Sequence, residues 1–298
     1  MHFLRISQRE LKNNFEVIFY TEPKPLKDHL DFLSDLDEKI IALDPDYFDW
    51  KFAKEDIYLC ENVKAICLQT TSFNWIDTEH AKEKNIPILN LKGFSSEAVS
   101  EFAFMLALGV ARKLPLIIQS NYKQDFLAHQ GMELRCKKAG IVGLGRIGNG
   151  IAEKTKAFGM DTFYWSKNSR NENFKYLELE DLFLSCDIIF ISLAYNEDTK
   201  NILSEKLIKS INKTSILISF NVTKKLINEE SVIKMVQDGD LYGYGTEEDN
   251  TGPDKIKGNI LILPAVAWDT TESLLKSGEM WTDSILKAKE GIFLNRVN

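Results

Sequence analysis

Three glycines are the residues of this chain whose spacing most clearly predicts chemistry. Gly143, Gly145 and Gly148 follow an apolar run that ends at Val142 and precede a pattern with helical period. The first glycine can take a tight turn, the second lets backbone approach a pyrophosphate, and the third lets helix and strand pack closely. N–H groups at the helix start face the anion. A further strand at 162–165 completes the context that predicts a dinucleotide loop, whereas the alternative is a turn that binds nothing.

The end of that second strand predicts which dinucleotide binds. An acidic residue about 20 positions beyond the glycines normally holds the 2′-hydroxyl of the adenine ribose. Here that position has no carboxylate, and the segment carries two hydroxyls and two cations, on Ser166, Lys167, Ser169 and Arg170. Charge-assisted donors of this kind suit a 2′-phosphate. We therefore expect NADP(H) in preference to NAD(H), the alternative being a basic turn exposed to solvent.

Composition excludes several classes of partner. The chain has 298 residues, a net charge of −7 and scattered Lys and Arg residues, so it has no basic face for nucleic acid or a membrane surface. No apolar run approaches the roughly 18 residues of a membrane span, and residues 1–5 do not form a signal peptide. The four cysteines lack CxxC spacing, which predicts reduced thiols in a cytoplasmic protein. We expect no metal site.

The elements that must position the glycine loop follow an alternating pattern. Buried strands are predicted at 186–191, 215–219, 241–245 and 260–263, separated by helical patterns. Strands of this kind imply a doubly wound parallel α/β sheet, with the ligand at the carboxyl ends of the strands.

A smaller unit precedes this sheet. A strand at 63–68, a helix at 77–84 and a strand at 86–89 form a second βαβ pattern. Residues 1–60 are less informative, with short apolar runs at 15–20 and 39–43 that indicate short strands alternating with helices.

A helix at 95–113, stopped by Leu114-Pro115, is apolar nearly all round. We expect it to pack on the dinucleotide domain and against a second subunit, so a homodimer is predicted. The apolar residues of the chain's tail also need a partner surface. We therefore expect a discontinuous substrate domain, residues 1–92 with 270–298, around a cofactor domain, residues 93–269.

The order of these pieces resembles the D-isomer-specific 2-hydroxyacid dehydrogenases, over most of residues 63–285. The Ala267-Trp268 pair and the strand end Trp165-Ser166-Lys167 are similar to the glycerate, hydroxypyruvate and glyoxylate reductase branch, which commonly uses NADPH. The other matching motifs are Ala81–Pro87, Glu97–Glu101, Glu133–Arg135, Gly143–Gly148, Phe158–Met160, Cys186–Ile188, Asp198–Lys200 and Leu226–Glu229.

This resemblance implies a Rossmann cofactor domain inserted in a smaller flavodoxin-like substrate domain, and dimers formed through the cofactor domain. It implies that backbone amides of Ser72 and Phe73 hold the substrate carboxylate, and that Trp268 contacts the substrate. Without the family, the loop at 71–73 is an ordinary connection. The implied cofactor-binding residues are Gly143, Leu144, Gly145, Arg146, Ile147, Gly148, Ser166, Lys167, Ser169, Arg170, Leu193, Ala194, Thr199, Asn221, Val222 and Glu247.

The catalytic residues depart from the family pattern. The family Arg position falls on Thr223, Val222 or Lys224, depending on the alignment, and the family His position after Pro264 is Ala265. Hydride transfer to a keto group needs a cation for the developing charge and a proton donor.

Lys224 is a candidate for the cation, although a solvated lysine is an equal alternative. Glu247 matches the family carboxylate near the nicotinamide, and Glu248 and Asp249 are nearby candidates for the acid. An acidic run in a loop is also often simply solvated.

Three functions fit these residues. The first is an NADP(H)-dependent oxidoreductase for a small 2-keto or 2-hydroxy acid, with an altered proton donor. The second is a catalytically impaired member of the family that binds dinucleotide as a sensor or assembly partner. The third is a reductase of an unrelated carbonyl compound that does not need the family Arg. We favour an oxidoreductase because the glycine loop and the cofactor-side positions are intact.

Overall fold

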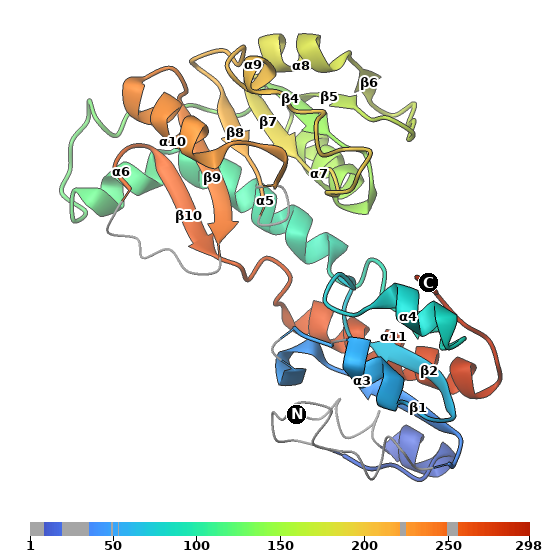
Figure 1. Cartoon of the computed structure of the whole chain (residues 1–298). Coiled ribbons are helices and arrows are strands. Elements are labelled where there is room, and N and C mark those ends of the chain that lie inside the picture. The colour runs from blue at the N-terminus through green and yellow to red at the C-terminus, as the bar shows by residue number, and fades with distance from the viewer. Residues whose placement is uncertain (1–8, 20–35, 49, 53, 221–224, 249–255) are drawn as a thin grey trace. The chain divides into compact units, whose positions relative to one another are not determined.

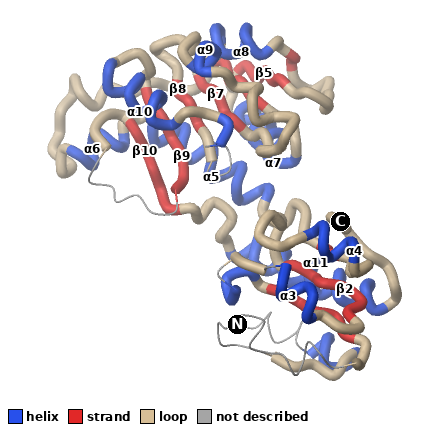
Figure 2. The backbone as a smooth tube through the Cα atoms, in the orientation of Figure 1, coloured by secondary structure: helices blue, strands red, loops and turns tan. Residues whose placement is uncertain are grey.

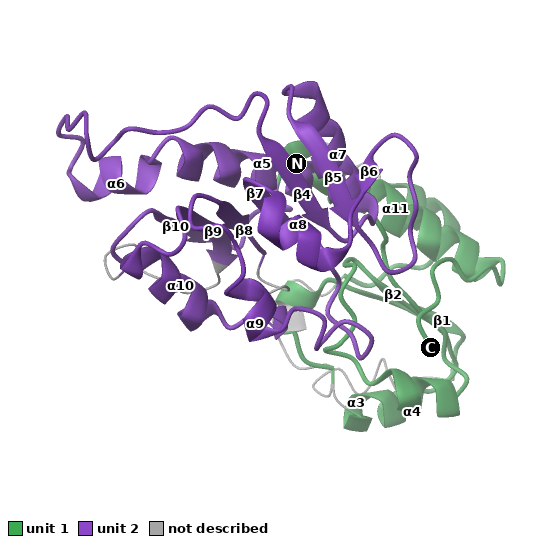
Figure 3. Ribbon diagram, turned by 90° about the horizontal axis from the view of Figure 1, so that it is seen from above, with its two compact units in different colours: residues 1–95, 270–298 green, residues 96–269 purple. Residues whose placement is uncertain are grey.

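The computed structural model describes residues 9–19, 36–48, 50–52, 54–220, 225–248 and 256–298 (Figure 1). The chain divides into two compact units. Unit 1 comprises residues 1–95 and 270–298, and unit 2 comprises residues 96–269 (Figure 3). The predictions for Asn221, Val222, Lys224 and Asp249 concern residues outside this described part of the chain.

Unit 2 contains a seven-stranded sheet in which every strand pair is parallel (Figures 1 and 2). The strand order is β10-β9-β8-β7-β4-β5-β6. Its strands are β4 (Lys138–Val142), β5 (Asp161–Trp165), β6 (Lys175–Tyr176), β7 (Ile188–Ile191), β8 (Ile216–Ile218), β9 (Gly243–Glu248) and β10 (Ile260–Pro264). The predicted doubly wound parallel sheet is confirmed, although β6 was not predicted.

Helices cover both faces of this sheet. They are α5 (Ser96–Ala111), α6 (Leu114–Gln119), α7 (Arg146–Ala157), α8 (Leu179–Ser185), α9 (Glu205–Ile208) and α10 (Glu229–Asp238). Successive side chains of a strand point to opposite faces of the sheet, so alternate residues join the cores on the two faces. Ile141 joins the core under α5 and α7, whereas the next residue, Val142, joins the core under α8, α9 and α10.

The apolar helix α5 is buried along one side within unit 2. Leu106 and Val110 are fully buried, and the sheet glycines Gly243 and Gly245 let them approach β9 closely. Met105 on the same helix remains 45% exposed. The helix ends at Ala111, earlier than predicted, and the proline that was expected only to stop it instead lies in the first turn of α6. Proline suits that position because its missing N–H has no helical partner there.

Unit 1 has a three-stranded parallel sheet in the order β1-β2-β3. Its labelled elements are β1 (Lys39–Leu43), the 3-10 helix η2 (Pro45–Phe48), α3 (Lys54–Leu59), β2 (Val63–Leu68), α4 (Thr78–Glu83), β3 (Ile88–Leu89) and α11 (Thr271–Lys289). Residues 9–14 are also helical. The apolar run at 39–43 therefore forms a strand, whereas residues 16–19 have no regular structure.

The last helix, α11, completes the core of unit 1. Ile285 and Ala288 pack with Ala65 and Cys67 of β2. The Trp281 indole N–H donates to the Cys67 carbonyl at 2.9 Å. Residues near the end of the chain thus cover a sheet made from its first hundred residues.

Candidate functional site

The glycine loop joins β4 to α7 in a conformation that needs its glycines. Gly143 has φ +97°, a left-handed value that favours glycine, and its N–H donates to the Trp165 carbonyl at 2.8 Å. A Cβ on Gly148 would lie 2.0 Å from the Gly143 carbonyl oxygen. The first and third glycines are therefore required by the fold of the loop itself.

Gly145 has a different role. It is the N-cap of α7 with ordinary extended torsion angles, and a Cβ built there would meet no atom within 4 Å. The side-chain amide of Asn149 donates to the carbonyls of Leu144 and Gly145, each at 3.0 Å, so the loop is held from the helix side. The space beside Gly145 and the first-turn amides, including those of Arg146 and Ile147, fit a pyrophosphate.

Ser192 braces the loop from the neighbouring strand. It follows β7, which pairs with β4 at the point where the strand order reverses. Its N–H donates to the Val142 carbonyl at 2.8 Å, and its hydroxyl donates to the Gly143 carbonyl at 2.6 Å. Sequence patterns alone do not single out Ser192, although a hydroxyl directly after a buried strand is a signal for such a residue.

The basic turn after β5 is held together by its own side chains. The buried Ser166 hydroxyl accepts from the Ser169 N–H at 3.2 Å. One guanidinium nitrogen of Arg170 donates to the carbonyls of Ser166 (2.7 Å) and Ser169 (2.9 Å). The guanidinium also stacks 4.7 Å from the centre of the Tyr176 ring. Arg170 is thus fixed, with its charge at the carboxyl end of β5.

The segment after β7 lies over the glycine loop. Leu193 packs so closely that a Cβ on Gly143 would be 3.0 Å from its side chain. Further on, the Thr199 hydroxyl donates to the Ala194 carbonyl at 2.6 Å, which closes the segment into a compact turn. The structure therefore gathers the glycine loop, the basic turn and the 193–199 segment at the carboxyl ends of three adjacent strands, β5, β4 and β7.

Glu247 lies farther along the same edge of the sheet, near the end of β9. It is 9% exposed, and its carboxylate accepts from the Ala267 N–H at 3.1 Å. This bond ties β9 to the segment after β10 that contains Ala265 and Trp268. Ala265 is half-buried and Trp268 is 40% exposed. The structure brings these three predicted residues into one region of unit 2.

A network of buried hydroxyl groups connects β8, β9 and the start of α10 near the carboxyl end of the sheet. The Tyr244 hydroxyl donates to a Glu229 carboxylate oxygen at 3.0 Å and lies 2.6 Å from the Ser219 hydroxyl. The Ser219 hydroxyl is also 3.0 Å from the Thr246 hydroxyl. Burial raises the pKa of the Tyr244 phenol, so it stays a neutral donor. Ser219 precedes the 220–228 segment and Glu229 follows it. The Tyr244 hydroxyl therefore connects the two ends of this segment.

The predicted substrate loop belongs to unit 1, where it follows β2. The Ser72 N–H donates to the Thr70 hydroxyl at 3.2 Å, so this amide is engaged within the loop. The Trp75 indole donates to the Ser72 carbonyl at 2.9 Å, and Phe73 packs on the unit 1 core. The loop is ordered by its own contacts.

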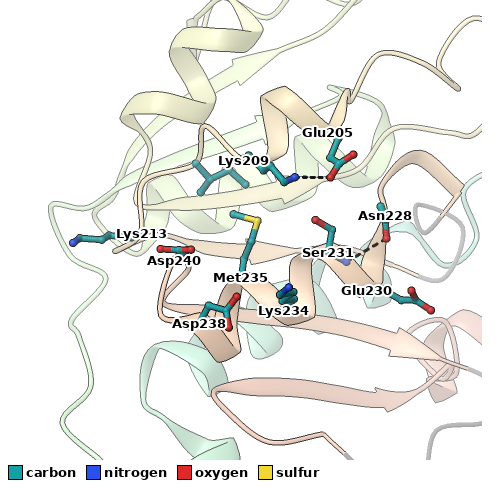
Figure 4. Close-up of a pocket in the computed structure, with 11 residues that line it drawn as sticks. Glu205, Lys209, Lys213, Asn228, Glu230, Ser231, Lys234, Met235, Asp238 and Asp240 are labelled. Atoms are coloured by element: carbon teal, nitrogen blue, oxygen red, sulfur yellow. Dashed lines mark hydrogen bonds and ion pairs between the residues drawn. The ribbon is translucent and has the colours of Figure 1, made fainter.

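A groove in unit 2 lies elsewhere, between α9 and α10 (Figure 4). It has a volume of about 860 Å³ and is lined by charges of both signs, such as Lys234 and Asp238. One of its cations, Lys209, is paired with Glu205 at 2.6 Å. None of the predicted site residues lines this groove, so the chemistry is not assigned to it. In the described part of the chain, no three His, Cys, Asp or Glu side chains are grouped to hold a metal ion.

The doubly wound sheet and the glycine loop at its switch point define a dinucleotide-binding domain. Residues 104–266 match the NAD-binding domain of the D-isomer-specific 2-hydroxyacid dehydrogenases. The chain belongs to this family of NAD(P)-dependent oxidoreductases, which confirms the resemblance described above. The family favours an enzyme over a dinucleotide sensor.

Individual proteins agree with this assignment. A protein of Staphylococcus haemolyticus, assigned by name to the 2-hydroxyacid dehydrogenases, is 29% identical over 253 residues, covering 80% of this chain and 79% of the relative. An acyclic imino acid reductase in complex with NADPH and D-Arg has a TM-score of 0.82 at 23% identity, covering 98% and 95% of the two chains. A glyoxylate reductase from Paecilomyes thermophila has a TM-score of 0.82 at 21% identity, covering 98% and 94%. These two structures establish a shared fold.

No described helix has both the length and the apolar composition needed to cross a bilayer.

Proposed function

We propose that this protein is an NADP(H)-dependent reductase of a small 2-keto acid or a related carbonyl compound. The observation that carries the cofactor proposal is the turn after β5, where Arg170 is fixed beside Ser166 and Ser169, next to the glycine loop. Bound nicotinamide supplies or accepts the hydride. The chain's task is to hold the dinucleotide, orient the substrate and provide the charge and the proton.

The proposed catalytic groups are Lys224 and Glu247, both inferred from the sequence. Lys224 would stabilise the carbonyl oxygen as a point charge, without the two-pronged grip of an arginine. Glu247 is already bonded to the Ala267 N–H, so we infer that it positions the segment that contains Ala265. Since Ala265 cannot donate a proton, turnover of ordinary 2-keto acids should be low.

Substrate binding is proposed for Ser72, Phe73 and Trp268. The Ser72 amide must exchange its bond to Thr70 for one to a substrate carboxylate, whereas Trp268 offers an exposed apolar surface. One structural neighbour is an acyclic imino acid reductase in complex with NADPH and D-Arg. The sequence prediction places no Arg or His at the family's catalytic positions in this chain. The substrate screen should therefore include 2-keto acids alone and 2-keto acids with an amine present.

The cofactor proposal is tested by calorimetry with NADPH and NADH. One or two charge-assisted hydrogen bonds, at about 1.5–3 kcal/mol each, predict at least a tenfold preference for NADPH. Arg170→Ala should weaken NADPH alone. Lys175→Ala is the matched control, because Lys175 lies on β6 over Phe163 and outside the turn. Equal dissociation constants for the two dinucleotides would refute the preference.

The catalytic proposal is tested by NADPH oxidation. Residual activity should fall in Lys224→Ala and rise in Ala265→His, which restores the family residue. Fast turnover of hydroxypyruvate or glyoxylate by the unmodified chain, unchanged in Lys224→Ala, would show that these residues are misassigned.

We also propose a homodimer in the cytoplasm. Met105 on α5 and Phe158 after α7 are 45% and 46% exposed, and an apolar surface of this kind is typical of an interface. Light scattering at micromolar concentration tests the dimer, which a monomer would refute. Burial of Cys60, Cys67 and Cys186 as free thiols supports a reducing compartment.

A further inference from the structure

One ion pair crosses the proposed dinucleotide site. The Lys167 ammonium lies 3.2 Å from a carboxylate oxygen of Asp198. Lys167 belongs to the basic turn after β5, and Asp198 belongs to the segment after β7. These strands lie on opposite sides of β4, so their carboxyl ends are two strand spacings apart, roughly 9–10 Å. The pair therefore spans the end of β4, where the glycine loop begins.

The two partners are held differently. Asp198 sits in a segment fixed by local bonds, since its N–H donates to the Asn196 side chain at 3.0 Å and Thr199 closes the turn. The side chains of Lys167 and Asp198 are 48% and 77% exposed, and an exposed pair of this kind is weak. Both ends can separate by side-chain rotation alone. The pair is thus ready to exchange partners without a change in the fold.

We propose that Asp198 is a specificity-determining residue that competes with the 2′-phosphate of NADPH for Lys167. The inference rests on the proposed function, because it needs the phosphate beside the basic turn. In the free protein Asp198 holds the Lys167 charge. When NADPH binds, its dianionic phosphate replaces Asp198 as the partner of Lys167. When NADPH dissociates, the ion pair between Lys167 and Asp198 forms again.

This exchange makes a prediction about kinetics. A carboxylate next to the phosphate raises the energy of bound NADPH through like-charge repulsion, and it offers Lys167 a new partner during release. Asp198 should therefore speed NADPH dissociation and leave NADH unaffected, since NADH has no phosphate at this position. Coulomb repulsion between a dianion and a carboxylate at short range, screened at physiological salt, corresponds to about three- to tenfold in affinity.

The test is Asp198→Asn, measured by stopped-flow fluorescence of bound NADPH and NADH. We expect the NADPH dissociation rate to fall about three- to tenfold, with NADH unchanged and the difference shrinking in high salt. In Lys167→Ala the competition for the lysine is gone and only the repulsion between Asp198 and the phosphate remains, so the further change Asp198→Asn should have a smaller effect than in the unmodified chain. Glu197→Gln is the matched control, since Glu197 is the preceding residue, has the same charge and pairs with Lys200 instead.

Each outcome decides the proposal. An equal effect of Asp198→Asn and Glu197→Gln would mean that only net charge matters and would overturn it. Weaker NADPH binding in Asp198→Asn would also overturn it, since Asp198 would then orient Lys167 for the phosphate. Failure of the proposed function is recognised separately, because the unmodified chain would then bind neither dinucleotide or would bind both equally.

Discussion

A methyl group on Gly145 should separate the fold of the glycine loop from its function. In Gly145→Ala the new Cβ meets no atom within 4 Å, and the torsion angles there suit any residue. Alanine is a poorer N-cap than glycine, at a cost of roughly 0.5–1 kcal/mol, but it lowers the entropy of the unfolded chain by a similar free energy. The free energy of unfolding should therefore change by less than about 0.5 kcal/mol.

Dinucleotide binding should respond quite differently. If the pyrophosphate approaches the backbone at Gly145, the methyl group occupies its space, and NADPH affinity should fall at least tenfold, about 1.4 kcal/mol. The contrasting variant is Gly148→Ala, whose Cβ would lie 2.0 Å from the Gly143 carbonyl oxygen. The higher helix propensity of alanine stabilises the folded state by about 1 kcal/mol, but overpacking destabilises it by about 1–3 kcal/mol or more. The new methyl group also disturbs the hydrogen bond from Ser192 to that carbonyl.

The assay pairs thermal unfolding without cofactor with NADPH titration of each variant. Gly145→Ala should unfold at the temperature of the unmodified chain yet bind NADPH weakly. Gly148→Ala should unfold at a lower temperature, by about 2–4 °C for each kcal/mol lost. Unchanged NADPH affinity in a folded Gly145→Ala variant would refute the assignment of the phosphate to this loop.

Two further predictions concern buried groups. Tyr244→Phe removes a hydroxyl that bonds both Ser219 and Glu229, so the free energy of unfolding in urea should fall by about 1–3 kcal/mol. The control Tyr242→Phe should lose less, because the Tyr242 hydroxyl makes one hydrogen bond, of 3.3 Å. Equal losses in the two variants would contradict the network. Burial raises the pKa of Cys67 and of Cys186 to about 12. As pH rises, the unfolded chain therefore loses these thiol protons before the folded chain does. The free energy of unfolding should fall above about pH 9, by roughly 1.4 kcal/mol per thiol at pH 10. Urea midpoints at pH 8 and 10 measure this, and a loss unchanged in Cys186→Ala would contradict it.

The sequence predicted most of the sheet because strands such as β7 and β10 are apolar runs between helical patterns. It did not predict β6, since two residues, Lys175 and Tyr176, carry no period. Leu114-Pro115 predicts only the end of a helix, whereas Pro115 lies in the first turn of α6. Proline is compatible with the end of one helix and with the start of the next, so the sequence does not distinguish the two.

The glycine loop could be predicted residue by residue because its demands are local. A left-handed turn and a close backbone contact leave glycine as the residue that fits at Gly143 and Gly148. Contacts between segments that are distant in the sequence produce no comparable local pattern. The bond from Ser192 to Gly143 and the pair of Lys167 with Asp198 arise from strand order, which a linear pattern does not contain.

The way unit 1 is assembled from two distant stretches has a consequence for its synthesis. Unit 2 is one continuous stretch, so it can fold as it leaves the ribosome, whereas β2 waits for α11. The Cys67 carbonyl meets its Trp281 partner 214 residues later, which at 5–20 residues per second is a delay of roughly 10–40 s. During that interval the apolar face of β2 and β3 that α11 covers is bare. We therefore expect the nascent chain to expose this apolar surface to chaperones until α11 has been made, whereas the cofactor-binding unit needs no segment from outside its own stretch to fold.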